Sequence, residues 1–433
     1  MDKNLVALLG FGLMFALLML RVPIGIAMGI SGVLGFGLLS GFAPALNLLG
    51  NVPLSVLTDY NLSVIPMFIL MGAFCSTAGM SRELFDAGLA WVGHRRGGLG
   101  LAAIGACAGF AAINGSSVAT AATMSQVALP EMRKAGYDSG LSAGLIAAGG
   151  TLGIMIPPSV IFVLYGIMTE TDITKLFFAG VVPGLLAVGF YAALVAFIAH
   201  RHPDAFPAGR RYAWGERFAA LRNLWPTLSL FLVVLGGMYL GFVTVTEAAG
   251  IGATGALAIG VLRGQLDRAA IKRALIDSLR VSSAIMLIVV GAYLFGYFLT
   301  VTQFTQKAVD LLVGLPIGAY GVLALVMVGY LVLGAVMDEL AMILLTVPIV
   351  YPVMMKLGFD PVWFGVIIVM AVPFGMICPP VGMNVFVINS IARDISLTRI
   401  YKGTMPFIAV DVLRLVLLCA FPVISLWLPG KLE

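Results

Sequence analysis

The sequence Gly153-Ile154-Met155-Ile156-Pro157-Pro158 is echoed, late in the chain, by Gly375-Met376-Ile377-Cys378-Pro379-Pro380. Each copy lies inside a stretch that is apolar enough to cross a membrane. Proline lacks a backbone N–H and clashes with the preceding helical turn, so each proline pair predicts a broken helix. In hydrocarbon, broken helices persist only where protein or a polar cavity covers the freed carbonyl groups. Two such breaks at corresponding positions indicate a secondary transporter with a binding site near the membrane midplane.

The composition places the chain among polytopic membrane proteins. Of its 433 residues, 61% are hydrophobic and 10% are charged, whereas a soluble protein is about 25% charged. The four cysteines fall in apolar segments without the spacing of a metal site or a disulfide framework, so we expect them to fill space between helices. The first apolar run is too long for a cleavable signal peptide and lacks a small-residue cleavage site, so we expect none.

The chain contains an internal repeat. At an offset of 222 positions, which carries Pro157 onto Pro379, the segment 130–138 (PEMRKAGYD) overlies the segment 352–360 (PVMMKLGFD). Proline, methionine, lysine, glycine and aspartate match there in one register, whereas two unrelated apolar segments would match mainly in leucine and valine. Such self-similarity predicts two copies of one structural unit.

The basic residues predict that the two copies face opposite sides of the membrane, because loops rich in Lys and Arg stay in the cytoplasm. In the second copy, basic residues form two loops, 201–222 and 263–280, around one helical hairpin. The equivalent loop of the first copy, 41–60, carries only Asp59. The inside of the first copy is marked instead by Arg95, Arg96, Arg133 and Lys134. We therefore expect an inverted-topology repeat with both chain termini outside.

The expected fold is an all-α polytopic membrane protein with repeats at 1–200 and 224–433, joined by a basic cytoplasmic linker at 201–223. Each repeat should contain a re-entrant helical hairpin and a broken helix. The hairpins are expected at 98–130 and 319–354, and the broken helices at 139–168 and 361–391. The segment 98–130 holds two apolar runs that are too short to span, with basic residues at both ends, so it should enter and leave on the same side.

The remaining helices are expected on both sides of these elements. In the first repeat they are 4–20, 24–40, 62–80, a surface helix at 82–95, and 180–199. In the second repeat they are 224–242, 245–262, 282–301, a surface helix at 303–313, and 406–427.

Two hairpin tips and two proline breaks should meet at mid-depth. The first tip offers amide and hydroxyl groups: Asn114, Ser116, Ser117, Thr120 and Thr123, with Gly115 between them. The second tip is 334–339 (GAVMDE), with Thr346 nearby. Hydroxyl, amide, carboxylate and freed carbonyl oxygens are the ligands that hard cations prefer. The N-termini of half-helices suit an anionic substrate. We therefore expect both a cation and an anionic substrate to bind there.

Several of these residues also have structural interpretations. Ser116 and Ser117 could bond back to the preceding turn, and Asp338 or Glu339 could cap the returning half-helix. Carboxylates inside a membrane are nevertheless functional candidates by default. We therefore keep both interpretations for these two acids.

Asn384 follows the second break by one turn, where the first copy has Phe162. We expect Asn384 to contact substrate or ion, so the candidate substrate-binding residues are Asn114, Ser117, Asp338 and Asn384. Asn389 is expected to form an interhelical hydrogen bond. Glu247 is expected to cap or pack its own helix.

The sequence contains no His-Glu-x-x-His, Walker or Cys-x-x-Cys motif, so we expect no enzyme activity. Without a nucleotide-binding motif, transport should be driven by an ion gradient. No cofactor is expected beyond a coupling ion, and no nucleic acid partner.

The chain resembles the large membrane subunit of tripartite ATP-independent periplasmic (TRAP) transporters, of the kind that carry C4-dicarboxylates or sialic acid. The resemblance covers nearly the whole chain and is carried by segments 114–120 (NGSSVAT), 153–159 (GIMIPPS), 244–250 (TVTEAAG), 345–349 (LTVPI) and 378–384 (CPPVGMN). Val245 departs from the family pattern, which usually has proline there. That position belongs to a scaffold helix.

The resemblance implies a mobile transport domain, made of both hairpins and both broken helices, that moves against a scaffold by an elevator mechanism. It also implies Na+ coupling, a small membrane subunit on a separate chain, and a periplasmic substrate-binding protein, at the bacterial cytoplasmic (inner) membrane. Carried onto this chain, the first sodium site would use Ser116, Ser117, Gly153, Pro157 and Pro158. The second would use Gly334, Met337, Asp338, Gly375, Pro379 and Pro380.

The expected function is therefore sodium-coupled import of a small organic anion, such as a C4-dicarboxylate or sialic acid. A standalone ion-coupled anion carrier of the same superfamily, which needs no binding protein, is the first alternative. A channel or an intramembrane enzyme is the second. The residues alone do not separate a dicarboxylate from sialic acid, a keto acid or a sulfonate, because specificity would lie largely in the binding protein.

Overall fold

The computed structural model describes residues 2–334 and 337–431, and these are helical apart from turns and one isolated bridge between Arg96 and Ala208. The first repeat contains α1 (Lys3–Met19), α2 (Ile24–Ser40), α3 (Phe42–Thr58), η1 (Asn61–Ser63), α4 (Val64–Thr77), α5 (Met80–Val92), α6 (Gly98–Asn114), α7 (Ser117–Lys134), α8 (Ser139–Met155), α9 (Val160–Thr169) and α10 (Ile173–Arg201). The linker contains α11 (Trp214–Asn223). The second repeat contains α12 (Trp225–Tyr239), α13 (Val245–Leu262), α14 (Arg268–Thr302), α15 (Phe304–Val313), α16 (Gly318–Gly334), α17 (Glu339–Lys356), α18 (Pro361–Ile377), α19 (Met383–Ile391), α20 (Leu397–Ala420), α21 (Val423–Leu426) and η2 (Pro429–Lys431).

The helices confirm the expected all-α polytopic fold. Among the described residues, six helices are long and apolar enough to cross a membrane, or up to eight if each of two bent pairs forms one span. The two helical hairpins, α6–α7 and α16–α17, are built from helices of 17 or 18 residues. About 20 residues are needed to cross the hydrocarbon core, so α6 and α16 are short for a span and suit re-entrant hairpins, whereas α17 is one of the six candidate spans.

The two helix breaks lie at the proline pairs. Helix α8 ends at Met155 and α9 begins at Val160, whereas α18 ends at Ile377 and α19 begins at Met383. The residues before each proline pair leave the helical region, as the ring of the following proline requires: Ile156 and Cys378 are both extended. The motif that opens the sequence argument therefore produces the same local structure twice.

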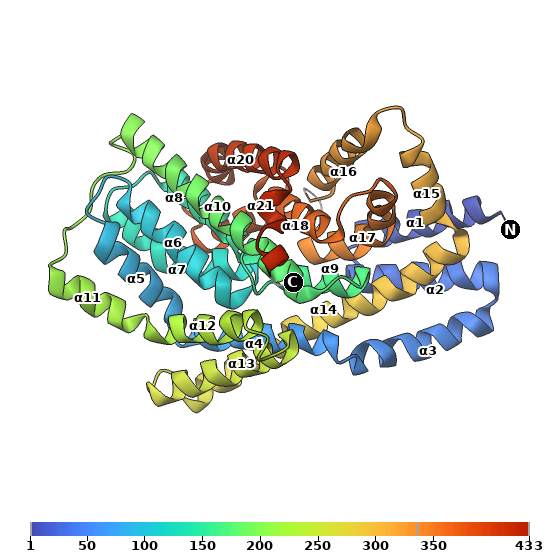
Figure 1. The fold of residues 1–433 in the computed structure, drawn as a ribbon, viewed down its shortest axis with the longest axis horizontal. Coiled ribbons are helices and arrows are strands. Elements are labelled where there is room, and N and C mark those ends of the chain that lie inside the picture. The colour runs from blue at the N-terminus through green and yellow to red at the C-terminus, as the bar shows by residue number, and fades with distance from the viewer. Residues whose placement is uncertain (1, 335–336, 432–433) are drawn as a thin grey trace.

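Figure 1 shows how the remaining helices support these elements. Helix α14 packs against α2 and α4, and α4 packs against α13, so these helices form one layer along the lower part of the view. The hairpins and broken helices lie above this layer, where α8 packs against α7 and α20. The elements that carry the candidate site are thus backed by long, largely apolar helices.

Two segments that we expected to be loops are helical. Residues 42–58 form α3, and most of 263–280 belongs to α14, which runs without interruption from Arg268 to Thr302. Pro44 does not prevent α3 because it lies in the first turn, where its missing N–H would have no partner within the helix. At the repeat offset, α3 and α4 correspond to the two halves of α14. The first copy bends by 63° between them, whereas the second copy forms one uninterrupted helix.

Two helices also begin earlier than expected. Helix α10 begins at Ile173, where the side chain of Asp172 caps it by accepting from Thr174 N at 2.7 Å. Its repeat counterpart α20 begins at Leu397 and ends at Ala420. The expected starts lie close to Pro183 and Pro406, but both prolines lie inside their helices.

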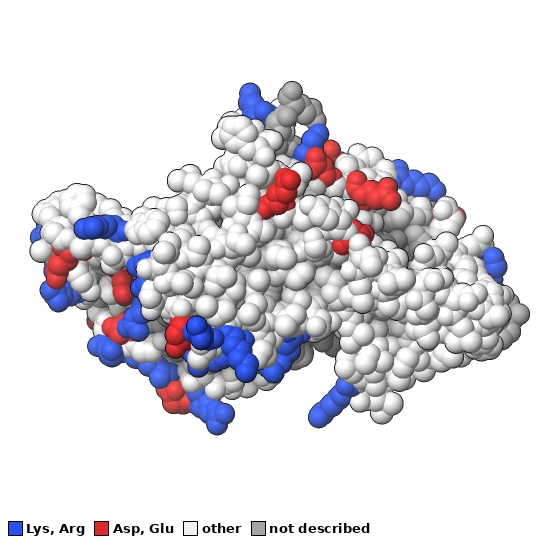
Figure 2. Space-filling model, turned by 90° about the horizontal axis from the view of Figure 1, so that it is seen from below, with Lys and Arg blue, Asp and Glu red and all other residues white. Residues whose placement is uncertain are grey.

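The charged side chains are unevenly distributed. In Figure 2, they gather toward the lower-left end of the view, and a broad uncharged surface extends across the middle. The large exposed side chains of the outer helices are correspondingly apolar, among them Leu8, Met19, Leu46, Leu57 and Leu232. Such a surface is suited to contact with lipid or with other membrane helices.

Candidate functional site

The first hairpin tip is a tight turn that begins a new helix. Helix α6 ends at Asn114, and Gly115 adopts φ 62°, a conformation that glycine accepts without strain. Ser116 is the N-cap of α7, and its Oγ accepts from Ala119 N at 3.4 Å. The side chain of Thr120 donates back to the Ser116 carbonyl at 2.8 Å. Ser116 therefore caps the helix that follows instead of bonding back to the preceding turn, and this cap orients the tip.

The first tip lies directly against the first break. A Cβ on Gly153 would lie 2.7 Å from the Ser116 carbonyl carbon and 2.9 Å from Thr120 Oγ1. A Cβ on Gly115 would lie 2.8 Å from the Pro158 carbonyl oxygen. Only glycine lets the two backbones approach this closely. The structure thus brings together the residues predicted for the first sodium site, and Pro157 and Pro158 are buried there.

The second tip lies against the second break in the same way. A Cβ on Gly334 would lie 2.9 Å from the Gly375 Cα, so these two glycines are in backbone contact. Asp338 is the N-cap of α17, and its carboxylate accepts from Ala341 N at 3.4 Å. Ala335 and Val336, which belong to the predicted tip, lie outside the described residues.

The two breaks differ in their surroundings. Pro379 and Pro380 are exposed, unlike Pro157 and Pro158. Carbonyls of the second break also have side-chain partners: Tyr401 donates to the Pro380 carbonyl at 3.0 Å, and Thr404 donates to the Ile377 carbonyl at 3.3 Å. The two halves therefore offer different backbone environments.

Asn384 connects the second break to the first tip. Its Nδ2 donates to Ser117 Oγ at 2.8 Å and to the Ala147 carbonyl at 3.0 Å. Asn384 and Ser117 are fully buried. The side chain thus crosses from α19 to α7 and α8, which belong to the other repeat.

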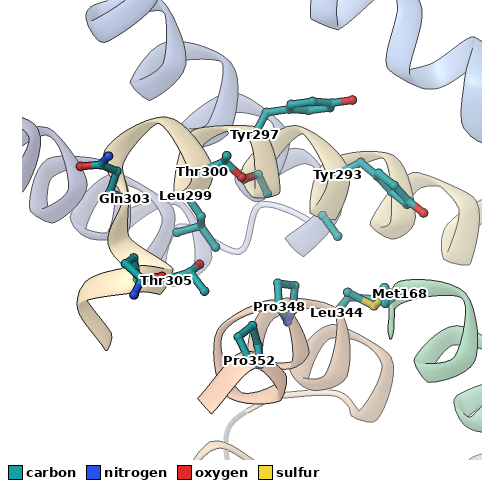
Figure 3. Close-up of a pocket in the computed structure, with 13 residues that line it drawn as sticks. Met168, Tyr293, Tyr297, Leu299, Thr300, Gln303, Thr305, Leu344, Pro348 and Pro352 are labelled. Atoms are coloured by element: carbon teal, nitrogen blue, oxygen red, sulfur yellow. The ribbon is translucent and has the colours of Figure 1, made fainter. Parts of the chain in front are cut away.

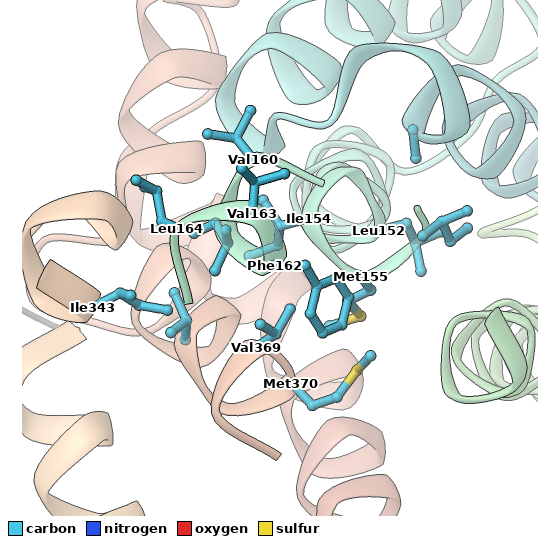
Figure 4. Packing of buried hydrophobic residues seen from close by; sticks show 14 of the residues in the cluster. Leu152, Ile154, Met155, Val160, Phe162, Val163, Leu164, Ile343, Val369 and Met370 are labelled. Atoms are coloured by element: carbon cyan, nitrogen blue, oxygen red, sulfur yellow. The ribbon is translucent and has the colours of Figure 1, made fainter. Parts of the chain in front are cut away.

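Phe162, at the equivalent position of the first repeat, has a different environment. Figure 4 shows it beside Met155, with Val369 and Met370 nearby in the apolar core. Phe162 has no polar atom to offer to an ion. The two repeats therefore differ at this position. At the first break the Phe162 ring packs in the apolar core, whereas at the second break the Asn384 amide donates to the hairpin tip of the other repeat.

A cavity of about 440 Å³ lies between the tips and the scaffold helices. It is lined from the first tip by Asn114 and Ser116, from the second tip by Glu339, and from α4 and α14 by residues that include Ser76 and Ser278. Ser117, Asp338 and Asn384 do not line it. Of the four predicted substrate-binding residues, Asn114 lines the cavity, Ser117 and Asn384 form a buried pair, and Asp338 caps α17.

A second cavity, of about 650 Å³, lies at the other half of α14. Figure 3 shows Tyr293, Tyr297 and Thr300 of α14 on one side, with Pro348 and Pro352 of α17 across from them. Residues of both α14 and α17 therefore line both cavities.

Sequence reasoning missed a buried charged cluster in α20. Arg414 Nη2 lies 3.0 Å from Asp411 Oδ1, and both side chains are at most 1% exposed. Tyr191 donates to Asp411 at 2.7 Å, and Arg414 Nη1 lies 3.1 Å from Met155 Sδ at the first break. Two opposite charges spaced i, i+3 inside an apolar helix were the signal that could have revealed this cluster.

Three further residues have clear structural roles. Glu247 forms a capping box with Thr244, accepting from its backbone N at 2.8 Å, as a capping role predicts. Asn389 donates to the Ile395 carbonyl at 2.8 Å, which closes the loop after α19 rather than joining two helices.

Ser142 lies in a Gly-x-Ser-x-Gly sequence (140–144), but it is buried inside the continuous helix α8. A nucleophile elbow needs a sharp turn between a strand and a helix instead.

Comparison of the sequence with known proteins finds one matching family. Residues 11–424 match the family described as the tripartite ATP-independent periplasmic transporter, DctM component. The C4-dicarboxylate TRAP transporter large permease protein DctM of Pseudomonas aeruginosa is 38% identical, covering 86% of this chain and 87% of that protein. The Rhodobacter capsulatus protein of the same name is 34% identical, and the match covers 98% of this chain and 99% of that protein. The sialic acid TRAP transporter large permease protein SiaM of Vibrio cholerae is 30% identical, covering 96% of each.

The fold is also similar to a solved structure. The crystal structure of the Alcanivorax borkumensis YdaH transporter superposes with a TM-score of 0.59, covering 88% of this chain and 89% of that chain. The sequence identity is 14%, so this likeness concerns the fold alone.

Proposed function

The chain belongs to the DctM family of tripartite ATP-independent periplasmic transporter subunits, and we propose that it is the sodium-coupled transport subunit of an importer for a small organic anion. A permease subunit of this family is a transporter and not an enzyme. The observation that carries the proposal is the contact of each hairpin tip with a helix break. This contact gathers hydroxyl and freed carbonyl oxygens inside an apolar protein.

Sodium suits the environment of the first tip. Ser117 Oγ and the carbonyls of the break at 153–158 are neutral oxygen ligands, which a hard cation accepts. A break inside a membrane helix supplies such carbonyls in ion-coupled transporters. The second tip would supply a corresponding site from Gly334, Met337, Asp338 and the break at 375–380.

An anionic substrate suits the cavity. First-turn residues of α7 and of α17 line it, so the positive ends of two helix dipoles face the same space. No Lys or Arg is among the described residues that line it. The anionic group would therefore be held by backbone N–H groups and by Asn114, which allows release without breaking a strong ion pair.

The partners and the movement follow from the same assignment. The hairpins and broken helices would move as an elevator against the layer that contains α2, α4, α13 and α14. A separate small membrane subunit would cover part of the apolar scaffold surface, and a periplasmic binding protein would deliver the substrate. We propose that the chain lies in the bacterial cytoplasmic membrane, with the basic linker in the cytoplasm and both termini periplasmic.

Uptake into proteoliposomes tests this function. The chain is reconstituted with the small subunit and the loaded binding protein, and uptake is measured with an inward sodium gradient or with potassium in its place. We expect uptake to collapse without sodium. Uptake that survives the exchange and follows only a proton gradient contradicts sodium coupling. Uptake by this chain alone favours the standalone carrier instead.

A further inference from the structure

Three buried polar atoms at the 440 Å³ cavity have no hydrogen-bond partner within the described structure. They are Asn114 Nδ2, Ser278 Oγ and Glu339 Oε2. The three residues are 9%, 5% and 6% exposed, so bulk water scarcely reaches them. Buried polar groups in folded proteins are nearly always paired, because leaving them unpaired is costly. Because all three line one cavity, they are candidate contacts for a bound molecule.

The three atoms offer different chemistry. Asn114 Nδ2 donates, the Glu339 carboxylate accepts, and the Ser278 hydroxyl can do either. Asn114 and Glu339 come from opposite hairpin tips, and Ser278 comes from scaffold helix α14. A molecule that satisfies all three must present an acceptor toward one tip and a donor toward the other.

The buried carboxylate of Glu339 is not required to start its helix. Asp338 is already the N-cap of α17 and accepts from Ala341 N. An acidic residue in the first turn is favoured by the helix dipole, but that preference does not require the side chain to be buried against a cavity. A carboxylate placed there costs desolvation and is a functional candidate.

The charges around Glu339 determine which ligands fit. No Lys or Arg is among the described residues that line the cavity. The other acidic residue in the lining is Asp277, which is exposed, and its Oδ1 lies 3.8 Å from Arg280 Nη1. A plain dicarboxylate would present only acceptor oxygens to the Glu339 carboxyl group and no donor. A ligand with an ammonium or hydroxyl group would give the carboxylate a partner.

We propose that the substrate carries a hydrogen-bond donor, an amino or hydroxyl group, beside its anionic group, and that Glu339 holds this donor. Asn114 and the first turn of α7 hold the anionic group, and Ser278 contacts the same molecule from the scaffold. The inference rests on the proposed function and narrows its substrate class to amino- or hydroxy-substituted carboxylates and sulfonates.

The test uses two matched series of ligands. One is succinate, malate and aspartate, and the other is ethanesulfonate, 2-hydroxyethanesulfonate and taurine. Within each series the members differ by the absence or presence of one hydroxyl or amino group. Sodium-driven uptake of each is measured in proteoliposomes with the complete assembly, for the unchanged chain and for Glu339→Gln. The control is Glu131→Gln, the same substitution at a surface ion pair with Lys134.

In at least one series we expect the rate of uptake of the substituted members to be about ten-fold higher than that of the unsubstituted member. The unsubstituted member cannot form the hydrogen bond to Glu339. Glu339→Gln should abolish this preference, and Glu131→Gln should retain it. Gel filtration and the thermal unfolding midpoint show whether each variant is folded. If Glu339→Gln is misfolded, the milder Glu339→Asp is measured, which should reduce the preference in part.

Two other outcomes are informative. Equal uptake of substituted and unsubstituted members, or an unchanged preference in Glu339→Gln, overturns the inference and leaves sodium-coupled import intact. If no member of either series is taken up in a sodium-dependent way, the proposed function itself fails, and the inference fails with it.

Discussion

Asn384 Nδ2 donates a hydrogen bond of 2.8 Å to Ser117 Oγ, so a residue of the second repeat holds the hydroxyl of the first hairpin tip. Both side chains are fully buried, and the same amide also donates to the Ala147 carbonyl. The geometry of the first tip is therefore set jointly by both repeats. Any ion that uses the Ser117 hydroxyl depends on the position of α19.

Asn384→Ala should raise the sodium concentration for half-maximal uptake by about ten-fold, because about 1.4 kcal/mol of orienting interaction is lost. Ser117→Ala should raise this sodium concentration by a similar factor. Because the two side chains act as a pair, the double variant should raise it no further than either single variant does. Asn389→Ala, on the same helix, is the matched control and should leave the sodium dependence unchanged. Equal shifts in the Asn384 and Asn389 variants would show a general effect of α19 instead.

Asp338→Ala should weaken the sodium dependence of uptake while the protein still folds. Asp338 and Asp360 both cap helices, accepting from Ala341 N at 3.4 Å and from Trp363 N at 2.8 Å. Losing either cap should cost about 1 kcal/mol of stability, seen as a lower thermal midpoint. Only Asp338 lies at a hairpin tip, so Asp360→Ala should keep its sodium dependence. The idea fails if the two variants respond to sodium alike.

Gly375→Ala should destabilise the protein and reduce uptake. Gly375 and Gly334 are in backbone contact, so an added methyl group must push the second tip away from the break. Such overpacking typically costs about 1–3 kcal/mol. Gly189 lies inside α10 with open space around it, and Gly189→Ala should be neutral or stabilising by up to about 1 kcal/mol. The measurements are thermal unfolding and sodium-driven uptake, and wild-type behaviour of Gly375→Ala would contradict the close contact.

Arg414→Leu should be among the most destabilising single substitutions in the chain. It leaves Asp411 buried without its cation, which typically costs about 3–5 kcal/mol. The double variant Arg414→Leu/Asp411→Leu should recover much of this loss, because no uncompensated charge remains. Thermal unfolding of the two single variants and the double variant forms the test. Additive losses would show that the pair does not act as a unit.

Much of the fold followed from local chemistry. Proline pairs cannot continue a helix, so the breaks at 156–159 and 378–382 were predictable from Pro157-Pro158 and Pro379-Pro380 alone. Turn-forming Gly115 and the N-cap Ser116 likewise defined the first tip. The pattern predicts loops at α3 and the first half of α14, because a segment with little charge or with many basic residues is typical of a loop between membrane helices. Their helical structure depends on packing against neighbouring helices.

The sequence by itself determined that the chain is a two-fold repeated membrane protein with paired hairpins and broken helices, because these features depend on composition, periodicity and proline geometry. Only the tertiary structure decided which residues meet. It placed Asn384 against Ser117, left Glu339 and Asn114 facing one cavity, and buried Arg414 beside Asp411. Such contacts join residues far apart in the chain, and they depend on how whole helices pack, which no local pattern specifies.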